Sequence, residues 1–147
     1  MQFNSGNFLI ETIVPIDELI VSRTDLKGII TYANETFAEI SGYSIDELIG
    51  KSHNIVRHPD MPKSIFKELW EDLQTKGKWS GFVKNLRKDS GFYWVYAEIS
   101  GVLKDGKIVE YKSIRTPISF EEKKKFQLFY DELKIKNNEK IRKVSYE

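Results

Sequence analysis

The segment 53–62, with the sequence HNIVRHPDMP, gathers side chains that could do chemistry within ten positions. It contains both histidines of the chain, one amide, one guanidinium and one carboxylate: His53, Asn54, Arg57, His58 and Asp60. Two histidines and an aspartate at these spacings do not match a helix-borne zinc pattern such as H-E-x-x-H. No glycine-flanked serine of the G-x-S-x-G type accompanies them. We therefore expect no catalytic and no metal-binding residues, and we expect that the chain is not an enzyme.

Two interpretations of this segment remain, cofactor binding and a local hydrogen-bond network. A planar and permanently charged guanidinium such as Arg57 suits a phosphate group. One histidine is enough for an axial haem ligand, so haem stays open as an alternative through His53 or His58. In the local interpretation, His58 and Asp60 bond within the segment and shape the entrance to the next helix.

A second candidate lies on the strand that is expected to begin at Trp79. Side chains alternate along a strand, so Asn85 shares a face with Trp79 and Val83. On a core-facing strand this amide is buried, and it must find a partner or cost about 1–3 kcal/mol. Its donors and acceptor suit the imide edge of a flavin or the edge of a purine, with Trp79 as a nearby plane. The alternative is that Asn85 caps the strand and bonds the turn over residues 88–91.

Helix patterns stand on both sides of the polar segment. The longest follows it directly over Lys63–Lys76, with apolar residues at intervals of three and four: Ile65, Phe66, Leu69, Trp70 and Leu73. Gly77 is expected to end this helix, and Asn34 is expected to cap an earlier one. Two capping boxes open a short helix and a terminal helix: Ser44 with Glu47, and Ser119 with Glu122.

Strand patterns surround these helices. Two short strands are expected at 19–21 and 29–32, and three long ones at 79–83, 93–102 and 107–118. Helices grouped between the second and third strands indicate an α+β domain in which they cover one sheet face above a pocket. The expected division is an N-terminal cap (1–18), a central domain (19–118) and a C-terminal helix with its tail (119–147).

The strand near residue 95 is apolar or aromatic on both faces. A sheet with helices on one side should be polar on the other. We therefore expect the N-terminal cap, the terminal helix or a second subunit to cover the outer face. A homodimer through the outer sheet face or the cap is the expected assembly.

The composition of the whole chain narrows the classes of function. Of 147 residues, 40% are hydrophobic and 13% aromatic, and the net charge of +1 leaves no electrostatic footprint for nucleic acid. No apolar run approaches the roughly 20 residues of a membrane span and no signal peptide is evident, so direct membrane insertion is not expected. The chain has no cysteine, which excludes disulfides and fits a reducing, cytoplasmic compartment.

Most of the chain resembles the PAS domain of Aer-type aerotaxis receptors. The similarity covers about residues 20–118 and lies in TDLKGIITYANETFAEISGYSIDELIGKSHNIVRHPDMP, then WSGFVKN, KDSG, YWV and SIRT. It implies a PAS sensor domain: a five-stranded antiparallel sheet with short helices on one face, an N-terminal cap and a C-terminal helix. It also implies a non-covalent FAD whose redox state controls a chemotaxis signal. The adduct chemistry of LOV-type domains is excluded, because it needs a cysteine.

Carried over onto matching positions, the resemblance implies a set of FAD-binding residues: Asn34, His53, Arg57, His58, Asp60, Phe66, Trp70, Trp79 and Asn85. In this interpretation Asn85 bonds the imide edge of the isoalloxazine and Trp79 packs near the ring. Arg57 and a histidine of the polar segment meet the diphosphate or ribityl portion.

The resemblance also bears on the partner. Aer-type receptors continue into a membrane anchor, a HAMP module and a signalling rod, whereas this sequence stops at Glu147. We therefore expect a separate cytoplasmic redox or oxygen sensor that reaches the inner membrane only through a membrane-bound methyl-accepting chemotaxis partner. The alternatives on the same fold are a haem-binding gas sensor and a cofactor-free interaction module.

Overall fold

The computed structural model of the protein describes residues 10–141. The elements of this part follow in the order β1 (Ile20–Thr24), β2 (Ile30–Ala33), α2 (Glu35–Ser41), α3 (Ile45–Leu48), η1 (His53–Val56), α4 (Lys63–Thr75), β3 (Lys78–Leu86), β4 (Phe92–Lys104), β5 (Lys107–Thr116) and α5 (Phe120–Lys136). η1 is a single turn of 3-10 helix at the start of the polar segment. Within the described residues, no helix is long and apolar enough to cross a membrane.

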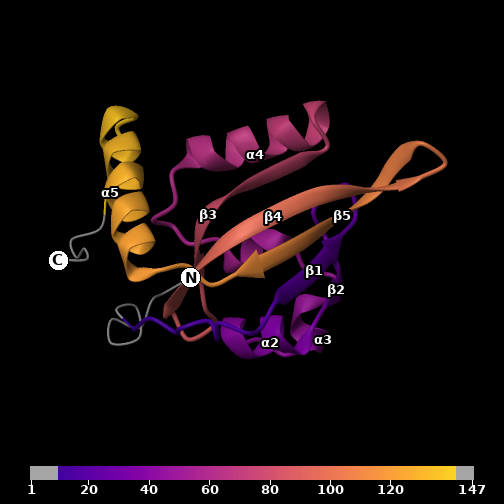
Figure 1. The fold of residues 1–147 in the computed structure, drawn as a ribbon, viewed down its shortest axis with the longest axis horizontal. Coiled ribbons are helices and arrows are strands. Elements are labelled where there is room, and N and C mark those ends of the chain that lie inside the picture. The colour runs from indigo at the N-terminus through magenta and orange to yellow at the C-terminus, as the bar shows by residue number, and fades with distance from the viewer. Residues whose placement is uncertain (1–9, 142–147) are drawn as a thin grey trace.

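The five strands form one antiparallel sheet in the order β2-β1-β5-β4-β3. Figure 1 shows α4 running along β3, and α5 at the opposite end of the molecule from the β4–β5 hairpin. The expected α+β fold, a five-stranded antiparallel sheet with helices inserted between its second and third strands, is confirmed.

Helix ends lie where the capping residues predict them. The Asn34 side chain accepts a hydrogen bond from the Phe37 amide, and Gly42 ends α2 in the left-handed conformation with φ 79°. Both predicted capping boxes are present, at Ser44 for α3 and at Ser119 for α5. These ends were predictable because a cap is an interaction between residues no more than about four positions apart.

β3 is longer than the sequence pattern predicts. It continues beyond Val83 to Leu86, because each of its residues pairs with β4 up to the pair Leu86–Phe92. A partner strand accepts and donates backbone hydrogen bonds whatever the local pattern, so the neighbour decides where a strand stops. This extension places Asn85 inside the sheet and not in the turn.

The outer sheet face is covered by α5 and by the N-terminal segment. Phe82 of β3 stacks on Phe126 of α5 with ring centroids 3.9 Å apart, and Trp94 of β4 stacks on Tyr130 at 6.3 Å. The backbone of Phe92 exchanges hydrogen bonds with residues 10 and 12. Of the three covers expected for this face, the structure contains the terminal helix and the N-terminal segment.

The face of α5 that meets the sheet differs from the expected apolar one. Besides Tyr130, its buried residues are polar: Lys123, Gln127 and Lys134. Phe129, expected as an alternative to Tyr130, is 45% exposed. The reason is that outer-face residues of β3 include a buried lysine, Lys84, which needs polar partners from the helix.

The proposed boundaries at residues 18 and 118 stay a prediction. Residues 1–9 of the expected cap and residues 142–147 of the expected tail lie outside the described part of the chain.

Candidate functional site

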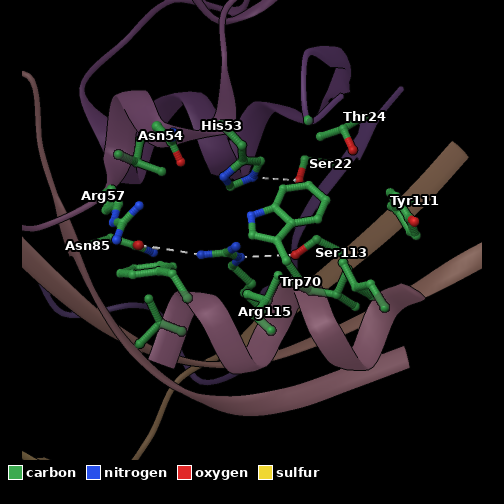
Figure 2. Close-up of a pocket in the computed structure, with 17 residues that line it drawn as sticks. Ser22, Thr24, His53, Asn54, Arg57, Trp70, Asn85, Tyr111, Ser113 and Arg115 are labelled. Atoms are coloured by element: carbon green, nitrogen blue, oxygen red, sulfur yellow. Dashed lines mark hydrogen bonds between the residues drawn. The ribbon is translucent and has the colours of Figure 1, made fainter. Parts of the chain in front are cut away.

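A cavity lies on the inner face of the sheet, under the helical segment that connects β2 to β3. Its lining comes from β1, β3, β4 and β5 on one side and from η1 and α4 on the other (Figure 2). Apolar side chains such as Val56, Leu69 and Leu73 form part of the walls, and the free space is about 80 Å³. Polar groups enter this apolar space from β5, β3 and η1.

Arg115 of β5 is the most unusual of these polar groups. The side chain lies in the cavity wall although the residue is only 7% exposed. Its Nε donates to the Ser113 hydroxyl at 3.0 Å and its Nη1 donates to the Asn85 side-chain oxygen at 3.4 Å. Both partners are neutral, and among residues 10–141 no carboxylate pairs with this guanidinium.

Burial lowers the pKa of Arg115 from its usual value, because a desolvated guanidinium loses the stabilisation that water gives its charge. A buried cation without a counter-ion is costly to the folded state. The cavity therefore favours an occupant that brings negative charge or several hydrogen-bond acceptors to Arg115.

Asn85 of β3 connects this cation to the helical side of the cavity. In the amide orientation that satisfies both neighbours, its nitrogen donates to the Val56 carbonyl at 3.2 Å and its oxygen accepts from Arg115 Nη1 at 3.0 Å. The backbone of Asn85 also forms a bridge with that of Arg57. One amide thus joins β3 to η1 and to Arg115, and its edge lies in the cavity lining (Figure 2).

His53 contributes a neutral ring to the wall. It stacks on Phe37 with ring centroids 5.5 Å apart, and its Nε2 shares a hydrogen bond of 3.1 Å with the Ser22 hydroxyl. Burial and the positive charge of Arg115 lower the pKa of His53 to about 3. The imidazole is therefore uncharged at neutral pH and serves as a hydrogen-bonding surface.

Aromatic and cationic side chains of α4 and η1 lie across the cavity. The Arg57 guanidinium sits 3.6 Å from the centre of the Phe66 ring, a cation–π contact. The Trp70 indole meets Tyr111 edge-on and packs against Gly28, a glycine with φ +85°. Trp70 is 36% exposed, so one side of the indole faces solvent.

The structure brings five of the nine predicted site residues together in this lining: His53, Arg57, Phe66, Trp70 and Asn85. Asn34 lies elsewhere and bonds the backbone of Val21, Phe37 and Leu19 as a helix cap. Trp79 is buried in the core with its ring over Gly81, and it does not line the cavity. The geometry gives the assignment of Asn34 and Trp79 to a cofactor site no support.

His58 and Asp60 lie on the other side of β3, under α5. The Asp60 amide donates to His58 Nδ1 at 2.9 Å, and the Asp60 carboxylate pairs with Lys84 Nζ at 2.9 Å. This matches the local interpretation of these two residues. They do not line the cavity, so the geometry does not support direct contact of either one with an occupant.

Sequence reasoning did not single out Ser22, Ser113 and Arg115 as site residues. Alternation along β5 predicts that Ser113 and Arg115 share a face, but only the register of β5 between β1 and β4 places that face at Asn85 and His53.

Comparison with known proteins finds one family model and several relatives. The model described as PAS fold matches residues 30–115. The chain is 49% identical over 106 residues to the aerotaxis receptor of Escherichia coli K12, and the match covers 72% of this chain and 21% of that receptor. The chain therefore spans about a fifth of that relative's length.

Solved structures agree with this fold. A PAS domain from Colwellia psychrerythraea is 26% identical with a TM-score of 0.62, and the match covers 68% of this chain and 86% of that one. A light-oxygen-voltage domain studied with a flavin analogue has a TM-score of 0.67 at 23% identity, over 84% of this chain and 90% of that one.

Proposed function

Since this chain belongs to the PAS fold family and is of the type found in an aerotaxis receptor, we propose that it is an FAD-binding sensor of redox state or oxygen. It signals in aerotaxis to a membrane-bound methyl-accepting chemotaxis partner. The observation that carries the proposal is the buried Arg115–Asn85 pair at the wall of an otherwise largely apolar cavity.

The donor set of the cavity fits a flavin. The ring system of a flavin is flat and apolar on its faces, and its edge carries carbonyl and nitrogen groups that accept and donate hydrogen bonds. Arg115 supplies donors and positive charge, and Asn85 supplies an amide edge. The aromatic faces of Phe66 and Trp70 provide planes for packing.

The free space of about 80 Å³ is smaller than the roughly 300–1,000 Å³ typical of small-molecule sites. Trp70 and the Arg57–Phe66 pair occupy the difference, and they stand on the side of the cavity nearest solvent. We infer that these side chains rotate outward to admit the ring, while Arg57 turns to the phosphate groups of the dinucleotide.

A bound flavin supplies reversible acceptance of electrons. Arg115 responds to added negative charge in the cavity, because its two hydrogen-bond partners are neutral and hold it weakly. His53, uncharged through burial and through the repulsion of Arg115, offers its ring nitrogens as polar contacts. A shift of Arg115 alters its bonds to Ser113 and Asn85, which belong to β5 and β3.

The partner and the assembly are proposed on weaker grounds. The name of the Escherichia coli relative supports a chemotaxis pathway. A homodimer through the outer face or the cap, and a cytoplasmic location beside the inner membrane, complete the proposal.

The visible absorption spectrum of freshly purified protein tests the cofactor. We expect flavin bands that bleach reversibly on reduction, and FAD on chromatography of the released nucleotide. A Soret band would establish the haem alternative, and a colourless folded protein would favour a cofactor-free interaction module.

Variants test the site. Asn85→Ala and Arg57→Ala should weaken FAD binding by roughly 5- to 150-fold, the range for a lost hydrogen bond of about 1–3 kcal/mol. Lys104→Ala, at the end of the hairpin strand β4, is the matched control. If both site variants keep the affinity of the control, the site assignment is refuted.

A further inference from the structure

The polar segment 53–62 belongs to two environments at once. His53 and Arg57 line the cavity on the inner face. His58 and Asp60 are buried on the opposite side, where Asp60 meets residues of β3 and α5. Arg57 and Asp60 are three residues apart, so a displacement of one within this short segment displaces the other.

The contact between this segment and α5 is ionic. The Asp60 carboxylate lies 2.9 Å from Lys84 Nζ and 3.9 Å from Lys134 Nζ, and all three side chains are at most 6% exposed. Lys134 Nζ also donates to the Pro59 carbonyl at 3.2 Å. A buried pair contributes little net stability compared with apolar packing, but removing one partner is strongly destabilising. Such a cluster therefore specifies where α5 sits.

β3 repeats the same two-sided arrangement. Asn85 faces the cavity, while Lys84, its neighbour in sequence, faces α5 and donates to Gln127 at 3.2 Å. The backbone bridge between Arg57 and Asn85 joins the two places where the cavity wall and the α5 contact are adjacent in sequence.

We propose that the cluster of Asp60, Lys84 and Lys134 couples docking of α5 to occupancy of the cavity, with Asp60 as a positioning residue for Arg57. The inference rests on the proposed function. An occupant that orders Arg57 also holds Asp60 and keeps the C-terminal half of α5 docked. Because coupling between two sites is reciprocal, loosening α5 at Lys134 weakens the hold on the occupant by the same factor.

Hydrogen exchange on the unaltered protein tests the coupling without any question of misfolding. Amides of residues 130–136 in α5 should exchange at least about 5-fold more slowly in FAD-loaded protein than in flavin-stripped protein, the lower end of typical coupling. Equal exchange in samples whose spectra prove full and zero loading overturns the inference and leaves the proposed function standing. Failure to take up FAD at all refutes the proposed function, and the coupling with it.

A variant pair tests the positioning role. Lys134→Met keeps the length of the side chain and removes its charge, and Lys136→Met makes the same change at an exposed position of α5. The first should raise the dissociation constant for FAD at least about 5-fold, although Lys134 does not line the cavity, and the second should leave it unchanged. Lys134→Arg should restore affinity. Equal affinity in Lys134→Met and Lys136→Met contradicts the proposal.

Discussion

The neutral state of His53 makes a prediction about the flavin-free protein. The folded pKa of about 3 lies below the value of about 6.5 for an unfolded chain. Below pH 6.5 the unfolded chain therefore binds a proton at this residue that the folded protein refuses. Stability that is present at neutral pH is lost as the pH falls from about 6.5 towards 3.

The size of this loss follows from the two pKa values. Between pH 7 and pH 5 the folded form stays neutral while the unfolded form becomes almost fully charged, which removes about 2 kcal/mol from the free energy of unfolding. His53→Gln keeps a polar side chain but does not titrate. The variant should therefore lack this part of the acid dependence.

Urea unfolding at pH 7 and pH 5 measures the effect, with wild type and His53→Gln compared at each pH. Subtracting the variant's change removes the contribution of all other titrating groups, among them His58. If both proteins lose the same stability between the two pH values, His53 is not desolvated as the structure indicates. A larger loss in the variant would reverse the reasoning altogether.

Three further outcomes are expected. Asn85→Asp should weaken FAD retention, because a carboxylate beside Arg115 neutralises the cation that the ligand would otherwise contact; equilibrium dialysis would show it, and unchanged retention would contradict it. Gly28→Ala should lower stability by about 1–2 kcal/mol, because its φ is +85° and a methyl group would press on Trp70; a normal thermal unfolding temperature would speak against this. Ser119→Ala should cost about 0.5–2 kcal/mol by removing the cap of α5, measured by denaturant unfolding, and a cost near zero would show that the cap is dispensable.

Several features of this molecule were readable from short stretches of sequence. Asn34, Ser44 and Ser119 each cap a helix, and Gly77 follows the end of α4 with φ 75°. The two-residue turn Asp105–Gly106 has positive φ at both residues and joins β4 to β5. Each of these depends on contacts within a few positions, so the local pattern carries the whole cause.

The place of Trp79 shows where alternation stops being informative. Trp79 and Asn85 do share the inner face, as the period of two predicts. However, six residues of a strand span about 20 Å, so sharing a face does not mean sharing a cavity. Which part of a face is covered by η1 and which by the core depends on the curvature of the whole sheet.

The sequence by itself determined the order of strands and helices, their caps, and five residues of the cavity wall. Only the tertiary structure decided that the segment 53–62 is divided, with Arg57 on one side of β3 and Asp60 on the other. It also decided that Arg115 is buried without a carboxylate partner, because that depends on how β5 registers against β1 and β4. Charges and amides take their meaning from neighbours distant in sequence, and a local pattern does not contain those neighbours.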